Sequence, residues 1–362
     1  MTSDKSQITN VKRQFDSHAL WMSMLIGAVG YKWFLPLSPI LPWLIFFMLF
    51  FTFCKVNPQD LRLHKWHWVV LFTQITLSLG VYAAVYYTTH IGFLAQGMML
   101  CFIMPTATAA PIIAGKLGGS IQNLTTFTLL SNFATSIIVP AFFPLVYTAS
   151  GMTFWPAFLL ILSRIAPLLL VPFFAAWLLR IGFNWYYRHH DQRPNTNDER
   201  QALSRNDELP TTTRQFELPV QWAKVPFYLW VCSIIVLTAV VTSDVITSYQ
   251  SQMINILILL VLSFFACLVQ FGLGKLIGYK LPAPSKGKDY QDVLINPAAA
   301  PKTMEGVSKI TAGQAFGQKN TSLGVWMAQM YLDPLASLGA AAYIIWQNLF
   351  NSVQLFYAAR KK

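Results

Sequence analysis

Long apolar runs separated by shorter polar stretches dominate the pattern of hydrophobic and polar positions along this chain. A helix needs about 20 apolar residues to cross the hydrocarbon core of a bilayer. By this measure the sequence predicts an all-α membrane protein with ten spanning helices. We expect them at about 18–35, 39–54, 66–87, 92–114, 121–147, 153–181, 225–248, 253–274, 308–332 and 335–359. Two polar segments, about 182–223 and 281–307, are expected to be cytoplasmic loops.

Composition favours the same class. Only 11% of the 362 residues are charged and 55% are hydrophobic, whereas a soluble globular protein carries about 25% charged residues. The net charge of +12 would suggest nucleic-acid binding in a soluble protein. In a membrane protein, loops that obey the positive-inside rule explain it instead. We therefore expect a lipid bilayer, and no nucleic acid, as the partner of this chain.

The positions of the 26 lysines and arginines predict the topology. Nearly all of them fall on one side of the membrane if the N-terminus is cytoplasmic, and Lys32 is on the other side. The positive-inside rule then places both termini in the cytoplasm, in a bacterial-type inner membrane. Ten spans divide into two halves of five, residues 1–150 and 151–362. Because each half has an odd number of spans, the second half runs inverted, as in many secondary transporters.

The fourth and ninth expected spans correspond in these two halves, and both carry signals of a broken helix. Proline removes a backbone donor, so the fourth span should break between Pro105 and Pro111. The ninth span holds a cluster of polar residues among glycines and should break between Gln314 and Asn320. Interrupted helices at matching positions in the two halves indicate the binding site of a transporter.

The charged residues inside the spans point to an anion. We place none of the 14 acidic residues inside a span, so a relay built on a buried carboxylate is not expected. Arg164 and Lys319 are cations near mid-depth, and an uncompensated cation in a low dielectric favours an anionic partner. Either side chain could instead snorkel or bind carbonyls freed by the breaks. The sequence holds no Walker loop, metal-ligand cluster or nucleophile motif, so we expect neither an enzyme nor a cofactor.

Several of these segments resemble motifs of the bile acid:sodium symporter family. FGQKNTSLG (316–324) is similar to the glutamate-valine-glycine-methionine-glutamine-asparagine pattern of the ninth helix in that family. PTATAAP (105–111) resembles the proline-glycine-glycine-threonine-alanine-serine-asparagine run of its fourth helix. WQN (346–348) and SNFATSIIVPAFFPL (131–145) resemble parts of its tenth and fifth helices.

The resemblance implies a core domain of helices 3–5 and 8–10, with broken helices 4 and 9 crossing, and a panel of helices 1, 2, 6 and 7. It implies an organic-anion substrate that is bile-acid-like, pantoate-like or keto-acid-like. Thr108, Asn320 and Asn348 match substrate-contacting positions, and Gln347 lies beside the last of them. The positions that match sodium ligands are Gln74, Ser131 and Thr135.

The sequence also departs from the family pattern. The glutamate of the ninth helix falls on Ala315, and its glutamine falls on Lys319. The serine and asparagine of the fourth helix fall on Ala110 and Pro111. Both sodium sites of the family therefore lose essential ligands, while a tethered cation is gained. We expect the ammonium of Lys319 to replace sodium and to donate to carbonyls freed where the ninth helix breaks.

These observations predict a sodium-independent secondary transporter for a small organic anion. One alternative is an ordinary sodium-coupled symporter whose ligands are displaced, and sodium-dependent uptake would distinguish it. The other is a non-transporting membrane sensor that signals through its cytoplasmic loop at 184–220. Deleting that loop should spare uptake in a transporter and abolish output in a sensor.

Overall fold

The computed structural model describes residues 21–56, 61–147, 152–190, 222, 225–283 and 303–360. These residues are helical almost throughout, and no strand occurs among them. The expected all-α class is therefore confirmed. The loops expected at 182–223 and 281–307 lie largely outside the described residues.

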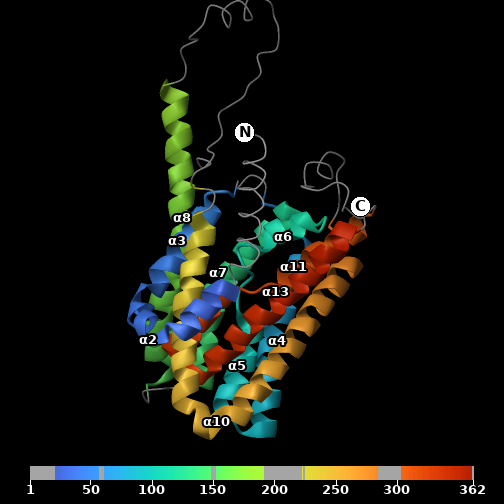
Figure 1. Cartoon of the computed structure of the whole chain (residues 1–362). Coiled ribbons are helices and arrows are strands. Elements are labelled where there is room, and N and C mark those ends of the chain that lie inside the picture. Colours follow the sequence, from blue (N-terminus) through green and yellow to red (C-terminus); the bar gives the residue numbers. More distant parts are fainter. Residues whose placement is uncertain are drawn as a thin grey trace, which may run out of the picture.

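The helices run up and down in one bundle (Figure 1). Residues 21–29 form the first described helix. The elements that follow in the first half are α2 (Tyr31–Phe34), η1 (Leu35–Ile40), α3 (Leu41–Phe53), α4 (Lys65–Thr89), α5 (Gly92–Ile103), α6 (Ala110–Lys116) and α7 (Ile121–Val146). Those of the second half are α8 (Phe154–His190), α10 (Val225–Lys280), α11 (Met304–Gly317), α12 (Thr321–Tyr331), η6 (Pro334–Ala336) and α13 (Ser337–Arg360). In Figure 1, α10 folds back at one end of the bundle, so its yellow and orange halves form separate rods.

Six segments among the described residues are long and apolar enough to cross a membrane. They are Tyr31–Phe53, Lys65–Thr89, Ile121–Val146, Phe154–Tyr186, Val225–Thr247 and Ser251–Lys280. The protein is thus a multi-pass membrane protein by the length and composition of its helices. The two segments within α10 correspond to the two spans that the sequence predicts there.

The distribution of side chains over the bundle also suits a lipid environment. Large apolar side chains face outward: Val29 is 78% exposed and Ile254 is 75% exposed. Polar side chains such as Gln270, at 0% exposure, are buried instead. Polar groups inside a membrane bundle hydrogen-bond across helices, whereas lipid tails solvate an apolar exterior. The polar interior of this bundle is where a site is to be sought.

Both expected helix breaks are present. The expected fourth span consists of α5 and α6, with residues 104–109 between them, and the expected ninth span consists of α11 and α12, with residues 318–320 between them. Helix α5 ends at Ile103, shortly before Pro105, because a residue that precedes proline disfavours the helical conformation. Helix α6 resumes with Pro111 in its first turn, where the missing N–H of proline costs no hydrogen bond.

Two sequence expectations need correction. Helix α8 does not end near residue 181 but continues to His190, and its end projects beyond the bundle in Figure 1. Polar residues mark where a helix leaves the hydrocarbon core of the membrane, but the helix itself can continue beyond that point. The second correction concerns Asp244, which lies inside the candidate span Val225–Thr247. The carboxylate is tolerated in the last turn of that span because Gln329 Nε2 donates to its Oδ2.

Glycines allow two of the central helices to approach closely. A Cβ atom at Gly339 of α13 would meet the backbone carbonyl of Gly97 on α5. No residue larger than glycine fits at this crossing without moving a helix. The crossing holds the first turns of α13 against α5 and thereby fixes α13 beside the two helix breaks.

Replacing Gly339 with Ala should lower the thermal unfolding midpoint in detergent, because overpacking of this kind costs about 1–3 kcal/mol. The matched control is Gly272→Ala in α10, where an added Cβ meets nothing within 4 Å. Because Ala is a better helix former than Gly, the control should be neutral or slightly stabilised. Equal midpoints for the two variants would contradict the close approach of α5 and α13.

Candidate functional site

The two helix breaks meet in the interior and pair with one another. Thr106 and Lys319 form an isolated antiparallel bridge. The two backbone bonds beside it are Asn320 N to Pro105 O (2.8 Å) and Ala107 N to Gln318 O (3.1 Å). These bonds replace part of the helical hydrogen bonding that the breaks remove, because buried backbone groups need a partner. We call residues 104–109 and 318–320 together the crossover.

The two bridge residues use their side chains in equivalent ways. Thr106 Oγ1 donates to the carbonyl of Ala315 (2.6 Å), at the end of α11. Lys319 Nζ donates to the carbonyl of Phe102 (3.0 Å), at the end of α5. Each acceptor lies four residues before the other member of the bridge. Each broken helix is thus capped by a side chain that comes from the opposite break.

The backbone N–H groups of the bridge residues show the same equivalence. Thr106 N donates to Ser131 Oγ (3.1 Å) on α7. Lys319 N donates to Gln347 Oε1 (2.9 Å) on α13, and Gln347 Nε2 donates back to Lys319 O (3.3 Å). In both halves, the long helix that follows the broken span supplies the side chain that holds the break.

The C-terminal end of α5 is capped entirely by side chains. Helices end with carbonyls that have no partner within the helix, and here four of them are satisfied from outside. Gln270 Nε2 binds Cys101 O (3.1 Å), Lys319 Nζ binds Phe102 O, and Gln74 Nε2 binds Ile103 O (3.2 Å) and Met104 O (3.0 Å). The negative end of the helix dipole lies at these carbonyls, so a positive charge is favoured there.

Lys319 is one of the largest fully buried side chains, with 1% of its surface exposed. Its ammonium also lies over the ring of Phe316, 4.9 Å from the centroid. The expectation that it binds carbonyls at the break of its own helix is wrong: its partner is Phe102 O, at the break of the other helix. The bridge places Lys319 beside the end of α5, while the carbonyls of Ala315 and Gly317 already bind Thr106 and Tyr343.

Asn320 combines a structural role with a free donor. Its Oδ1 accepts from Leu323 N (3.2 Å) and caps the N-terminus of α12. Its Nδ2 is buried and has no hydrogen-bond partner among the described residues. The N-terminus of a helix favours negative charge, so an anion beside Asn320 would find both a donor and a favourable dipole.

The structure does not bring all the other predicted substrate residues to the crossover. Thr108 lies two residues past the bridge and is half-buried. The amide of Asn348 donates to Ile344 O (2.7 Å) in its own helix. Arg164 is exposed on α8, and its charge acts on Tyr331, at the opposite end of α12 from Asn320.

The residues that match sodium ligands support the break of the fourth span. Ser131 and Gln74 bind its backbone as described above, and the Oε1 of Gln74 is buried without a partner in the described part of the chain. Thr135, one turn after Ser131 on α7, is buried. Whether any of the three binds sodium stays a prediction. Within the described residues, no group of His, Cys, Asp and Glu could hold a metal ion.

Sequence reasoning missed several residues that hold the crossover. Gln270 and Tyr343 each cap a freed carbonyl, and Thr106 caps another. A chain of amides also joins α11 to α13: Gln318 donates to Gln314 and Asn351, and Gln314 donates to Gln354. A lone polar residue in an apolar run was a usable signal for Gln270. Nothing in the pattern distinguished Thr106 from the neighbouring threonine.

Neither a protein-family model nor a curated protein matches this chain. The likeness to the bile acid:sodium symporter family therefore rests on the sequence motifs and stays a prediction.

Replacing Thr106 with Val keeps the shape of the side chain but leaves Ala315 O without its donor. An unsatisfied buried acceptor costs about 1–3 kcal/mol, so the unfolding midpoint in detergent should fall. Thr73→Val is the matched control, because Thr73 bonds within its own helix on an exposed face and should be neutral. A midpoint of Thr106→Val equal to that of the unmodified protein would contradict the proposed capping.

Proposed function

We propose that this protein is a secondary transporter that moves a small organic anion by alternating access without sodium. The observation that carries the proposal is the buried ammonium of Lys319, which binds the end of one broken helix from within the break of the other. Interrupted helices that face each other in a membrane bundle are where transporters bind their substrates and coupling ions. A cation at this point stabilises the carbonyl end of a broken helix, as a bound coupling ion would otherwise do.

The topology that belongs to this proposal has ten spans, with both termini in the cytoplasm of a bacterial-type inner membrane. Residues 1–150 and 151–362 form the two inverted repeats. The equivalent contacts of Thr106 and Lys319 support this division, because two residues at matching positions in inverted repeats would make matching contacts. The same contacts support membership of the bile acid:sodium symporter family, with a core of helices 3–5 and 8–10 and a panel of helices 1, 2, 6 and 7.

The substrate site in this proposal begins at Asn320. A carboxylate or sulfonate would accept from the buried Nδ2, which has no partner in the described part of the chain, and would lie at the positive end of the α12 dipole. Thr108, which is half-buried on the other break, would supply a hydroxyl to the same anion. Gln347 and Asn348 act through the backbone, since Gln347 fixes Lys319 and Asn348 binds its own helix. Arg164 would act later in the path, near the other end of α12.

Lys319 replaces a free ion for a physical reason. A sodium ion at the end of α5 would have to lose its water and its freedom of movement on each cycle. An ammonium that is covalently attached loses neither, and the dipole of α5 compensates its charge. The backbone carbonyls at the end of α5 then have their cation at all times. In a sodium-dependent crossover they would have it only when sodium is bound.

One observation favours the second candidate function, a sodium-coupled symporter with displaced ligands. Among the residues that the structure describes, the Oε1 of Gln74 is a buried acceptor without a partner, and oxygen acceptors are the ligands that hard cations prefer. It lies in the same side chain that caps the end of α5. The first test below therefore compares uptake with and without sodium.

Uptake of a carboxylate into proteoliposomes should change less than twofold when choline replaces sodium. Lys319→Gln should lose at least tenfold in uptake, because the end of α5 loses its cation. Lys116→Gln, at an exposed lysine of α6, is the matched control and should transport normally. Size-exclusion chromatography checks that each variant is folded. A clear sodium requirement in the unmodified protein, or full activity of Lys319→Gln, would refute the proposal.

Replacing Asn320 with Asp tests the anion site separately from the fold. The new carboxylate can still cap α12, since Asp is a good N-cap residue, but it removes the donor and repels an anion. Affinity for a carboxylate should fall at least tenfold, while the unfolding midpoint should stay close to that of the unmodified protein. Asn320→Ser, which keeps a neutral cap, should bind with intermediate affinity. If the Asp variant binds carboxylates normally, the substrate site lies elsewhere.

A further inference from the structure

Two lysines lie close together where α10 ends and α11 begins, outside the crossover. Lys275 of α10 is half-buried, and Lys309 of α11 is exposed. The charge that acts on Lys275 is that of Lys309, so the two ammonium groups repel each other. No acidic side chain of the described residues offsets this repulsion. Two like charges at a partly buried position favour an anionic partner.

Gly313 of α11 gives the side chain of Lys275 its place. A Cβ atom at Gly313 would lie 2.7 Å from Lys275 Cγ, 3.5 Å from its Cε and 3.6 Å from its Cδ. The methylene stem of Lys275 therefore lies flat against α11, over a residue that has no side chain. Lys309 precedes Gly313 by four residues and shares this face of α11. The contact thus directs the ammonium of Lys275 toward Lys309 despite the repulsion.

Helix α13 forms the third side of this site. It runs in the same direction as the second half of α10 (Figure 1). Phe271 of α10 stacks on Phe350 of α13, with 5.6 Å between the ring centroids. Residues four further along share the same helix faces, so Lys275 and Gln354 lie at the same level. Gln354 also accepts from Gln314 Nε2 of α11 (3.3 Å). The site therefore lies where α10, α11 and α13 meet.

The second half of α10 lies at the edge of the bundle (Figure 1). Its outward face is apolar: Phe265 is 53% exposed and Leu276 is 52% exposed. Gly272 is on the same face, where an added Cβ would meet nothing within 4 Å. Acyl chains of the bilayer would cover this face. Lys275 is about 7.5 Å from the end of α10 at Lys280, so its ammonium can reach the headgroup of a lipid on this face.

We propose that Lys275 and Lys309 bind the phosphate group of an anionic phospholipid whose acyl chains lie along the outward face of α10. The phosphate accepts from both ammonium groups and removes their repulsion. Clusters of cations at the membrane surface attract anionic lipids. Free phosphate has the same charged group, but it lacks the gain from apolar contact along α10. This inference goes beyond the proposed function and does not depend on transport.

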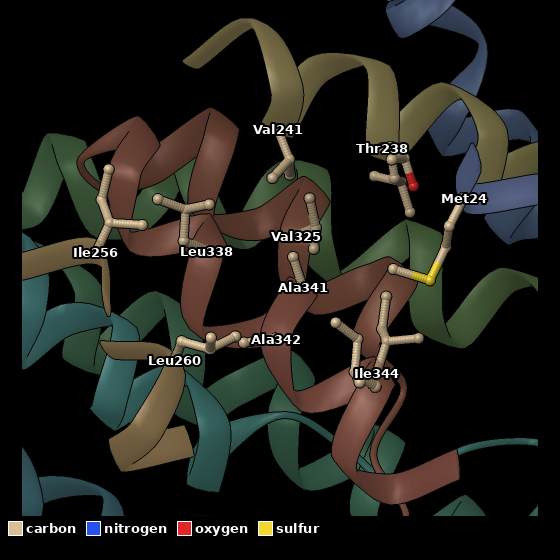
Figure 2. Close-up of a pocket in the computed structure, with 12 residues that line it drawn as sticks. Met24, Thr238, Val241, Ile256, Leu260, Val325, Leu338, Ala341, Ala342 and Ile344 are labelled. Atoms are coloured by element: carbon tan, nitrogen blue, oxygen red, sulfur yellow. The ribbon is translucent and has the colours of Figure 1, made fainter. Parts of the chain in front are cut away.

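An apolar cavity of about 190 Å³ offers a lipid chain a different place in the bundle. Figure 2 shows its lining, which includes Met24, Leu260, Ala341 and Ala342. No charged residue is among the described residues that line it. A lipid held there by its chain would not distinguish between headgroups. Selectivity for an anionic headgroup therefore separates binding at the two lysines from binding in the cavity.

The test is native mass spectrometry of the full chain in detergent, titrated with phosphatidylglycerol or with phosphatidylcholine of the same acyl chains. Phosphatidylglycerol should bind more tightly. Lys275→Gln should weaken its binding about fivefold, the factor expected for one lysine at a membrane surface, and should leave phosphatidylcholine binding unchanged. Lys116→Gln removes the same charge from α6, at the same end of the bundle (Figure 1). This matched control should change the affinity by less than about twofold.

Gly313→Ala separates the geometry of the site from its charge. The three atoms nearest to the added Cβ all belong to Lys275, so this variant displaces the lysine stem and keeps the net charge. It should weaken phosphatidylglycerol binding as Lys275→Gln does. Gly80→Ala, where an added Cβ meets nothing within 4 Å, is its control and should bind normally. Normal binding by Gly313→Ala would overturn the site, even if Lys275→Gln does not fold.

Three other results would also overturn the proposal. Equal affinity of the unmodified protein for the two lipids would assign the lipid to an apolar site such as the cavity. Equal losses in Lys275→Gln and Lys116→Gln would show that net charge alone attracts the lipid. Displacement of phosphatidylglycerol by an equal concentration of inorganic phosphate would identify free phosphate as the ligand. Uptake is measured in none of these arms, so the proposed function stands or falls separately.

Discussion

Hydrocarbon offers no hydrogen bonds, and this constraint governs the whole structure. A membrane helix that breaks leaves backbone donors and acceptors without partners, each at a cost of several kcal/mol in lipid. This chain breaks two helices and brings the two breaks together, so that each satisfies the other. Several buried polar residues of the bundle, among them Gln74, Gln270 and Ser131, hold backbone groups that the breaks release. This part of the polar interior therefore satisfies backbone groups, and the proposed binding site lies beside it.

The helices and the positions of the breaks could be predicted because local signals determine them. Apolar runs of the required length mark the spans, and Pro105, Pro111 and the glycines near Lys319 mark the breaks. The position of Lys319 near the middle of a span was also visible in the pattern, whereas the crossing of the two broken helices was implied only by the family resemblance. What could not be predicted was which carbonyl it binds. That depends on how the two breaks pair in space, and a sequence with no aligned relatives carries no information on their register.

The lack of information on spatial contacts also explains the other differences between the expected and the observed positions of residues. Gln347 and Asn348 are neighbours in the sequence, but only Gln347 faces the crossover, because successive residues of a helix point in different directions. Asp244 already falls within the expected span 225–248, so the expectation of no acidic residue inside a span disagreed with the hydropathy pattern itself. The apolar cavity had no signal at all, because alanines such as Ala341 and Ala342 look alike in the sequence whether they fill a contact or leave a space.

The attachment of a cation to the chain has an electrical consequence. A symporter that carries two sodium ions with a monovalent anion moves one net positive charge, so the membrane potential drives uptake. In the proposed transporter the positive charge is Lys319, which is bound to Phe102 O within the protein and would not cross with the substrate. Each turnover would then carry the net negative charge of the anion alone. One elementary charge gains or loses about 2.3 kcal/mol for every 100 mV, and the cytoplasmic side of a plasma membrane is normally negative. Without another coupled ion, such a protein would favour efflux of its substrate over accumulation.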